Sequence, residues 1–384
     1  MTGERFRWHP AARIVTPDGS SLGPGAEGDQ VIPPRPAAEA LQQALVATDA
    51  GLSFRIGGDG PPPLSGPVFE TLTSGSTGTP RRIRRSQDSW IASFAVNARL
   101  FGFGPGRRIG IPGQLVQSLA LYGSLEALHL GAELHLLDGL RPDRQAKAIR
   151  DRAIDTLYAS PAQLRLIAEA GIALPALRLV LCGGARLDPG TRALTAACAP
   201  GADLREFYGA AEASFITLAD RKTPEGSVGR AYPGVELRLR DDEIWVHSPY
   251  LFDGYASDPG PAVWQDGWLS IGERGRIEKG YLYLHGRAGR MVTVADQNVF
   301  PEAVETFLLT LPGVTRAAAL ARPDGKRGHV IEAFVTGGDA DAMLSTCRSQ
   351  LGPHAAPRRI HRIADWPLLP SGKTDLAALE RALP

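Results

Sequence analysis

A segment rich in glycine and hydroxyl side chains, TLTSGSTGTP at residues 71–80, has the composition of a phosphate-binding loop. Gly75 and Gly78 allow tight backbone turns, so that N–H groups can converge on phosphate oxygens. The side chains that add hydroxyl donors or positive charge are Ser74, Ser76, Thr77, Thr79, Arg81 and Arg82. The segment lacks the Gly-Lys-Ser/Thr end of a Walker A loop. On composition alone, a flexible Gly/Ser linker fits equally well.

A lone carboxylate, Glu212, follows the sequence FYGAA at residues 207–211. The preceding residues are expected to form a strand, which places Glu212 at a strand's C-terminal end, where open α/β sheets bind ligands. An aromatic ring such as that of Tyr208 can stack on a base, and a carboxylate can hold Mg²⁺ near phosphates. Taken alone, however, the pattern favours an ordinary strand-to-helix turn.

Three charged residues beside glycines complete the candidate set. Glu273 ends GWLSIGE and could accept hydrogen bonds from both ribose hydroxyls, while Arg287 could meet phosphate or ribose. Near the C-terminus, Gly372 lets the chain deliver Lys373 into a site. Each signal is weak alone, because such turns are common in β structure and lysines are normally exposed.

The elements that must position these residues are strands and helices that alternate from residue 68 onward. Ser160-Pro161 and Asp188-Pro189 each combine a capping side chain with a first-turn proline, and Ser86 can cap a helix that runs to Phe101. Strand–helix alternation implies βαβ units and a parallel sheet. The expected strands lie at 68–73, 107–112, 132–137, 154–158, 177–182 and 203–207.

The pattern changes twice in the second half of the chain. After residue 225, short β-type runs separated by Gly, Asp and Pro turns predict an antiparallel β region. From residue 288, a helix opened by Pro301, two strands, a helix over 340–351 and a last strand in RRIHRIADW predict a small α+β unit. The fold class expected is α/β, with a parallel-sheet body, a β subdomain and a small C-terminal domain.

The composition excludes several classes of protein. The 384 residues include 42 Lys+Arg and 41 Asp+Glu, a net charge of +1, which argues against binding to nucleic acid. The three cysteines are scattered and do not suit a disulfide scaffold or a Cys/His zinc site. There is no run of about 18 apolar residues, and the N-terminus does not resemble a signal peptide. We therefore expect a cytoplasmic enzyme without a membrane span.

Taken together and in this order, the motifs resemble those of the adenylate-forming superfamily of acyl-CoA synthetases, peptide-synthetase adenylation domains and luciferases. The resemblance covers about residues 70–376. Other stretches that match are LRLVLCGGA at 177–185, GSVGR at 226–230, Gly254-Tyr255 and GRAGRMVTVADQNVFPEAVE at 286–305. The resemblance implies a compact member with three parts. These are a short, partly irregular leader (1–66), a large ATP- and acid-binding domain (67–287) and a small mobile lid (288–384).

The resemblance also implies the chemistry. A carboxylate oxygen of a small organic acid attacks the α-phosphate of MgATP, pyrophosphate leaves, and a thiol then attacks the acyl-adenylate. Lys373 would bridge the carboxylate and the α-phosphate, Glu212 would bind Mg²⁺, and Arg287 would lie in the nucleotide site. The other nucleotide-binding residues implied are Thr73, Ser74, Gly75, Ser76, Thr77, Gly78, Thr79 and Arg81 at the phosphates, Gly184, Ala185 and Tyr208 at the adenine, Glu273 at the ribose, and Gly209 and Ala211 beside them.

Four residues depart from the family's pattern. Arg81 replaces a lysine and Glu273 replaces an aspartate, and both keep the charge. Arg290 stands where an acidic hinge residue is usual, and Asp296 replaces a glycine beside the path of the pantetheine thiol. The first two changes are compatible with adenylation, whereas the last two bear on transfer to CoA.

Three functions stay open on the sequence. The first is a carboxylate–thiol ligase that loads CoA or the phosphopantetheine of an acyl carrier protein, with neither acceptor favoured. The second is an adenylating enzyme that uses an amine or another non-CoA nucleophile. The third is a degenerate AMP- or acyl-binding protein, which the retention of Glu212, Arg287 and Lys373 argues against. Small residues near the expected acid pocket suit an aryl or medium acyl chain; they are Ala210, Ala211 and Ala213.

Overall fold

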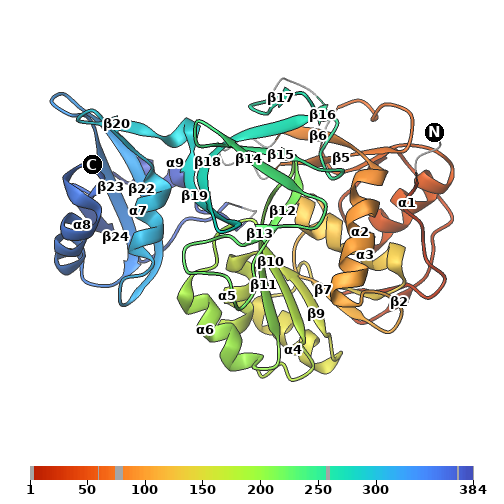
Figure 1. Cartoon of the computed structure of the whole chain (residues 1–384). Coiled ribbons are helices and arrows are strands. Elements are labelled where there is room, and N and C mark those ends of the chain that lie inside the picture. Colours follow the sequence, from red (N-terminus) through yellow and green to blue (C-terminus); the bar gives the residue numbers. More distant parts are fainter. Residues whose placement is uncertain (1–3, 59, 74–80, 257–259, 370–371, 384) are drawn as a thin grey trace. The chain divides into compact units, whose positions relative to one another are not determined.

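The computed structural model describes residues 4–58, 60–73, 81–256, 260–369 and 372–383. The chain forms two compact units (Figure 1). The first comprises Met1–Leu187, Thr191–Glu236 and Val246–Pro261, and the second comprises Asp188–Gly190, Leu237–Trp245 and Ala262–Pro384. The expected boundary between residues 287 and 288 falls inside the second unit, so the division into a large domain and a lid stays a prediction.

The first unit is built on a sheet whose central strands are parallel. In spatial order its strands are β2 (Ser21–Leu22), β1 (Arg13–Val15), β8 (Glu133–Leu136), β7 (Arg108–Ile111), β9 (Thr156–Ala159), β10 (Leu179–Gly183), β11 (Asp203–Ala210), β12 (Ser214–Leu218) and β13 (Arg230–Ala231). The ladders from β1 to β11 are parallel, and β12 and β13 extend the sheet antiparallel. The predicted parallel-sheet body is confirmed, with strands at all the expected runs from 107–112 onward.

Four helices accompany this sheet among the described residues of the first unit's strand–helix region. They are α3 (Ser118–Leu130), α4 (Pro142–Asp151), α5 (Pro161–Glu169) and α6 (Pro189–Cys198) (Figure 1). The predicted cap of α5 is confirmed as a capping box, because Ser160 and Gln163 each accept a hydrogen bond from the other's backbone N–H. Ile149, Leu157 and Val180 belong to a buried aliphatic core between these helices and the sheet, and removing that surface from water stabilises the layers.

A second sheet in the first unit carries the strands that flank the expected phosphate loop. Its order is β16 (Gly254–Tyr255), β6 (Arg82–Ser86), β5 (Val68–Leu72), β4 (Phe54–Ile56) and β3 (Val31–Ile32). The run expected at 68–73 belongs here and not to the parallel sheet, because β5 pairs with β6 in an antiparallel ladder. Helix α1 (Ala37–Asp49) contacts β3 and β4, and α2 (Gln87–Phe101) contacts β6.

The first 66 residues are packed into the first unit. They supply β1 to β4 and α1. Phe6 and Ile14 have no exposed surface, and the ring of Phe6 meets that of Phe69 edge-on, with centroids 5.3 Å apart. The N-terminal segment therefore helps to form the core beneath β5.

The second unit begins with the predicted β region. Its strands, in spatial order, are β14 (Glu236–Arg240), β15 (Glu243–His247), β18 (Trp268–Glu278) and β19 (Tyr281–Arg287). Strand β18 pairs antiparallel with β19 and also with β17 (Val263–Gln265). A short 3₁₀ turn, Ala288–Arg290, follows β19.

The C-terminal part of the second unit has the predicted α+β pattern. It contains the hairpin of β20 (Val292–Val294) and β21 (Gln297–Val299), the sheet β22 (Val314–Asp324), β23 (Gly328–Gly337) and β24 (Arg359–Arg362), and the helices α7 (Pro301–Leu308), α8 (Ala340–Ala355) and α9 (Leu376–Arg381). The helix expected over 340–351 is regular up to a kink at Gly352, where φ is 75°. Among the described residues, no helix is long and apolar enough to cross a membrane.

Candidate functional site

The two ends of the expected phosphate loop are held together by hydrogen bonds. The Thr73 N–H donates to the Arg81 carbonyl oxygen at 2.8 Å, and the Arg81 N–H donates to Thr73 Oγ1 at 2.9 Å. These bonds continue the β5–β6 hairpin by one pair and fix where the loop leaves and re-enters the sheet. The predicted loop residues between them, Ser74, Gly75, Ser76, Thr77, Gly78 and Thr79, lie outside the described residues.

The residues expected around an adenine meet at the C-terminal ends of β10 and β11. These strands are parallel, with Gly183 opposite Phe207, so that Gly184 and Ala185 follow beside Tyr208. Gly184 has a φ of 91°, a conformation that favours glycine, and both Gly184 and Ala185 are exposed. The structure therefore brings these three residues to one edge of the sheet, where ligands bind in open α/β folds.

Glu212 lies in a tight turn between β11 and β12. This turn connects two antiparallel strands, so the strand-to-helix alternative considered for the motif is wrong. Ser214, which ends the turn, has a φ of 56°, and a Cβ on Gly209 would collide with the Ser214 carbonyl oxygen. Gly209 is therefore required by the close approach of the two strands, which confers a structural role on it in addition to the predicted one.

The Glu212 carboxylate has a neutral hydrogen-bond partner. The Tyr255 hydroxyl donates to Glu212 Oε1 at 3.1 Å, and the Phe252 N–H donates to the Glu212 carbonyl oxygen at 2.8 Å. Among the residues that the structure describes, no group of three His, Cys, Asp or Glu side chains could hold a metal. A single carboxylate fits Mg²⁺, which takes one or two carboxylates and completes its shell with substrate phosphates and water.

Glu273 and Arg287 form an ion pair in the second unit. They are direct cross-strand partners on β18 and β19, and Arg287 Nε lies 2.9 Å from Glu273 Oε1. The Glu273 side chain is 9% exposed and the Arg287 side chain 43% exposed. The pair holds the carboxylate in place, and the guanidinium is the more exposed of the two side chains.

Lys373 follows a closed turn near the C-terminus. The Leu369 N–H donates to the Lys373 carbonyl oxygen at 2.8 Å, the Gly372 N–H donates to the Leu369 carbonyl oxygen at 2.8 Å, and Leu368 forms a β-bridge with Thr374. Lys373 is half-buried in the second unit. Its backbone is thus fixed, while its role toward a substrate stays a prediction.

Arg290 is anchored within the second unit by three acceptors. Its guanidinium lies 3.1 Å from Glu302 Oε1 and 2.9 Å from Glu305 Oε1, and it donates to the Ala319 carbonyl oxygen at 2.7 Å. Burial raises the pKa of Glu302, and the charge of Arg290 opposes that shift. The departure from an acidic hinge residue is therefore matched by two carboxylates on α7.

Asp296 lies at the exposed tip of the β20–β21 hairpin. Val294 pairs with Gln297, so Ala295 and Asp296 form a two-residue turn, and their φ angles are 45° and 66°. Two successive positive φ angles are typical of a type I′ turn, in which Asp is one of the few tolerated residues other than glycine. The aspartate thus keeps the backbone conformation for which a glycine is usual.

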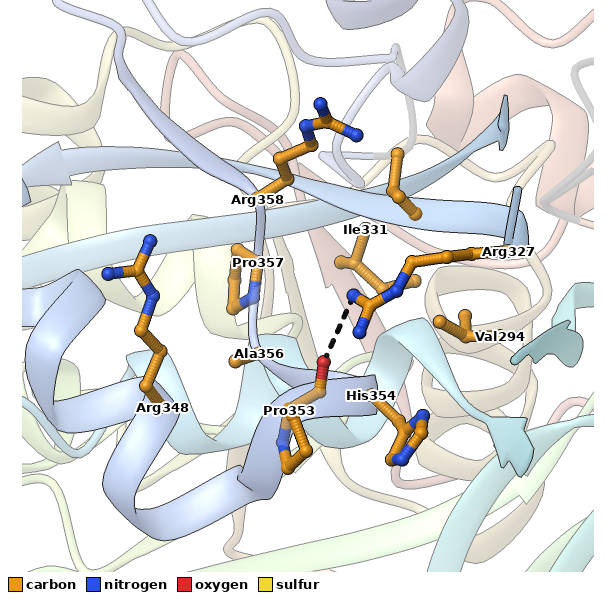
Figure 2. A pocket seen from close by; sticks show the side chains of 10 residues that line it. Val294, Arg327, Ile331, Arg348, Pro353, His354, Ala356, Pro357 and Arg358 are labelled. Carbon is orange, nitrogen blue, oxygen red and sulfur yellow. Dashed lines mark hydrogen bonds between the residues drawn. The ribbon is translucent and has the colours of Figure 1, made fainter. Parts of the chain in front are cut away.

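A basic hollow of about 460 Å³ opens in the C-terminal part of the second unit (Figure 2). It is lined by Val294, Arg327, Val330, Ile331, Arg348, Pro353, His354, Ala356, Pro357 and Arg358. The Arg327 guanidinium points across it and donates to the Pro353 carbonyl oxygen at 3.3 Å, while Arg358 is paired with Asp324 at 3.0 Å. Arg348 is exposed at another edge. Three cations around a partly apolar floor can receive phosphate groups.

Two residues with contacts to the Glu212 turn are absent from the predicted site. Tyr255 belongs to a stretch that matches the family pattern, but its contact with Glu212 spans 43 residues. Arg85 lies on β6, whose sequence RIRRS contains three arginines and is therefore not recognisable as a buried strand from its composition. Neither contact leaves a local signal in the sequence.

Two protein-family descriptions match the chain. "AMP-binding enzyme" matches residues 26–256, and "AMP-binding enzyme C-terminal domain" matches residues 303–373. An uncharacterized acyl–CoA ligase, YhfT, of Bacillus subtilis (strain 168) is 30% identical over 323 residues, which are 80% of this chain and 67% of that protein.

Two solved structures have a similar fold over nearly the whole chain. The amide bond synthetase McbA from Marinactinospora thermotolerans has a TM-score of 0.77 at 24% identity, and the match covers 97% of this chain and 96% of McbA. ATP-bound MatB from Rhodopseudomonas palustris has a TM-score of 0.80 at 19% identity, with the same coverages of 97% and 96%. The likeness supports the α/β fold with a small C-terminal α+β part.

Proposed function

The chain belongs to the AMP-binding, adenylate-forming enzymes, and from this premise we propose that it activates a small carboxylic acid with ATP and transfers the acyl group to a thiol. The observation that carries the proposal is the family match over residues 26–256, within which Glu212, Tyr208 and Gly184 lie at the C-terminal edge of a parallel sheet. Activation of an acid through an adenylate is the reaction of the family.

In the first half-reaction, a carboxylate oxygen attacks the α-phosphorus of ATP and the bond to the bridging oxygen of the β-phosphate breaks. Pyrophosphate leaves, and the acyl-adenylate stays bound. We assign Lys373 to the junction of carboxylate and α-phosphate, because two anions approach only where a cation offsets their charge. Mg²⁺, held by Glu212, would supply further charge neutralisation at the phosphates.

The family pattern assigns two groups of residues to the nucleoside. Tyr208 and the Gly184-Ala185 turn offer a flat surface and exposed backbone to the adenine. The Glu273 carboxylate can accept hydrogen bonds from ribose hydroxyls, and Arg287 fixes its position through their ion pair. These assignments follow the family pattern and the pairing of the strands that carry the residues.

In the second half-reaction, a thiolate attacks the acyl carbonyl carbon and AMP leaves with the electron pair of the broken anhydride bond. We propose CoA as the acceptor in preference to a carrier protein. The basic hollow supports this choice, since CoA carries a diphosphate and a 3′-phosphate, whereas phosphopantetheine on a protein carries a single phosphodiester. The name of the relative YhfT, an uncharacterized acyl–CoA ligase, agrees with this choice.

An amine acceptor is the second candidate. The observation that favours an amine is Asp296, a charged residue at the tip of the β20–β21 hairpin. The family pattern has glycine at this position, beside the path of the thiol. An amine would attack the same carbonyl carbon, lose a proton and release AMP. The product would be an amide, the kind of bond in the name of the amide bond synthetase McbA. The two candidates share the first half-reaction and differ only in the second.

Pyrophosphate release with aryl, short and medium carboxylates tests the first half-reaction. An acid-dependent signal that requires Mg²⁺ is expected, and its absence with the whole panel would favour a non-catalytic AMP- or acyl-binding protein. CoA, a holo-carrier protein and simple amines are then added in parallel with the best acid. Formation of the CoA thioester faster than the other two products is the expected result, and exclusive amide formation would replace the proposal by the second candidate.

A further inference from the structure

Arg85 is an arginine without any exposed surface, and it is hydrogen-bonded to the turn that carries Glu212. Its Nη1 donates to the Ala211 carbonyl oxygen at 2.5 Å and its Nη2 donates to Ser214 Oγ at 2.7 Å. Nη2 also donates to the Tyr250 carbonyl oxygen. One guanidinium thus joins both sides of the Glu212 turn to the segment that leads to Tyr255.

We propose that Arg85 is a positioning residue that holds the Glu212 turn in the shape that presents its carboxylate to Mg²⁺ and ATP. The inference rests on the role proposed above for Glu212. It concerns this chain's own side chain, since Arg85 donates to the Ala211 carbonyl oxygen just before Glu212 and to the Ser214 hydroxyl two residues after it.

The hydrogen bonds around Glu212 connect its turn to β6 by two separate routes. The Phe252 N–H and the Tyr255 hydroxyl bind Glu212 from one side. Tyr255 is paired with Ile83 across the β16–β6 ladder, two residues from Arg85. Strand β6 therefore fixes Glu212 twice, once through the ladder to Tyr255 and once through the guanidinium of Arg85.

The turn needs such a clamp because its backbone is unfavourable on its own. Ser214 adopts a φ of 56°, which costs free energy for a residue with a Cβ. The Ser214 hydroxyl also donates to the Tyr250 carbonyl oxygen at 3.2 Å. The Arg85 guanidinium therefore faces three acceptor oxygens, those of Ala211, Ser214 and Tyr250. A planar cation with five N–H donors can satisfy several acceptors at once, which a lysine with a single ammonium group does less well.

The charge of Arg85 is retained in this site. Burial lowers the pKa of Arg85 to about 10, and the carboxylates of Asp253 and Glu212 oppose that shift. The guanidinium also lies 5.7 Å from the centroid of the Trp90 ring, a distance at which the ring face attracts a cation. Removing this cation would take a donor from the Ala211 carbonyl oxygen and leave the Tyr250 carbonyl oxygen with only the Ser214 hydroxyl as a donor among the described residues.

The test compares the Mg²⁺ dependence of four variants in the pyrophosphate-release assay. Arg85→Met removes the donors and the charge, Arg85→Lys keeps the charge, and Glu212→Gln probes the carboxylate itself. Arg55→Met is the matched control, because Arg55 is also fully buried but binds Glu70 and the carbonyls of residues 57, 60 and 61. Thermal unfolding of each variant reports stability separately.

We expect Arg85→Met to raise the Mg²⁺ concentration for half-maximal rate about tenfold, since small misplacements of a reacting group have large effects. The KM for the acid should change less, and Arg85→Lys should restore part of the Mg²⁺ response. Arg55→Met should lower the unfolding temperature without moving the Mg²⁺ response. If Arg85→Met is too unstable to assay, Ser214→Ala removes one acceptor of the clamp and should move the Mg²⁺ response in the same direction.

The outcomes separate this inference from the proposed function. An unchanged Mg²⁺ response in folded Arg85→Met, or an equal shift in Arg55→Met, overturns the role of Arg85 while Glu212→Gln still tests the metal site. An unchanged response in Glu212→Gln overturns the role of Glu212, and the inference about Arg85 with it. If the parent protein releases no pyrophosphate, Mg²⁺-dependent binding of ATP replaces turnover as the readout for the same variants. Parent protein without Mg²⁺-dependent ATP binding would overturn both.

Discussion

The Tyr255 hydroxyl donates a hydrogen bond to Glu212 Oε1 at 3.1 Å, across 43 residues of chain. This contact joins the second sheet of the first unit, through β16, to the turn at the end of β11. It gives the expected metal ligand a fixed orientation without neutralising its charge. The phosphate-loop hairpin and the carboxylate are therefore linked through β6.

Tyr255→Phe removes this bond and leaves the ring. We expect the Mg²⁺ requirement for pyrophosphate release to rise about fivefold, because one hydrogen bond contributes about 1 kcal/mol to the orientation. Tyr250→Phe is a matched control, since the Tyr250 hydroxyl donates to the Pro233 carbonyl oxygen at 2.7 Å and not to Glu212. Equal Mg²⁺ responses in the two variants would show that Tyr255 is a packing residue only.

Lys373→Ala should abolish adenylate formation while sparing thioester formation from a preformed acyl-adenylate. The loss of one cation at the transition state is expected to cost about 3 kcal/mol or more, which is a slowing of a hundredfold or greater. Pyrophosphate exchange and single-turnover transfer measure the two half-reactions separately. Exchange within tenfold of the parent rate would contradict the assigned role.

Asp296→Gly should raise transfer to CoA severalfold and leave pyrophosphate exchange nearly constant. Glycine tolerates the φ of 66° at this position, so the hairpin keeps its turn while bulk and charge are removed. Asp296→Asn is the control, because asparagine also accepts a positive φ and keeps the bulk without the charge. A CoA rate that does not change in either variant would show that the hairpin tip does not limit the thiol step.

Arg348→Ala should raise the KM for CoA about tenfold, the effect of one charge-assisted hydrogen bond to phosphate. The KM for the acid and the rate of pyrophosphate exchange should stay constant. Arg348 lines the basic hollow and is not one of the predicted nucleotide-binding residues. Dephospho-CoA should be less sensitive to the change. Arg381→Ala, on α9 and outside the hollow, serves as the control, and a similar KM in both variants would argue against CoA phosphates in the hollow.

Glu126 should make stability depend on pH. Burial raises its pKa to about 8, and hydrogen bonds from Tyr158 and Asn97 oppose the shift. Because the folded state holds this proton more tightly than the unfolded state, the contribution to stability is present below the ordinary carboxyl pKa and is lost as the pH rises to about 8. Glu126→Gln should flatten the unfolding temperature over this range, with its largest gain near pH 8, and an unchanged pH profile would contradict the shift.

The alternating elements of the first unit were predictable because their signals are local. Ser160 and Pro161 begin α5, and the apolar runs around Leu157 and Val180 can form buried strands whatever lies elsewhere in the chain. Such strands bury both faces, so hydrophobicity identifies them. The candidate nucleotide-binding segments at the ends of these strands were located by the same pattern, and their roles stay predictions.

The second sheet and the clamp around Glu212 could not be predicted in this way. β6 has an Arg-rich sequence that suggests an exposed segment, yet Arg85 has no exposed surface, because its acceptors come from residues 211, 214 and 250. Likewise β5 resembles a strand of the parallel sheet until its partner is known. Long-range partners decide both cases, and they leave no periodicity in the sequence.

The three contacts of the Arg290 guanidinium restrict where the backbone can act as a hinge. The Arg290 side chain contacts Glu302, Glu305 and the Ala319 carbonyl oxygen, and so it is held to α7 and β22. A rotation about the φ and ψ angles of Arg290 would break these contacts. The residue before it, Gly289, has open space where a Cβ would stand. A rotation of the C-terminal part is therefore expected to pivot at Gly289 or an earlier residue, one position ahead of the residue that the family pattern suggests.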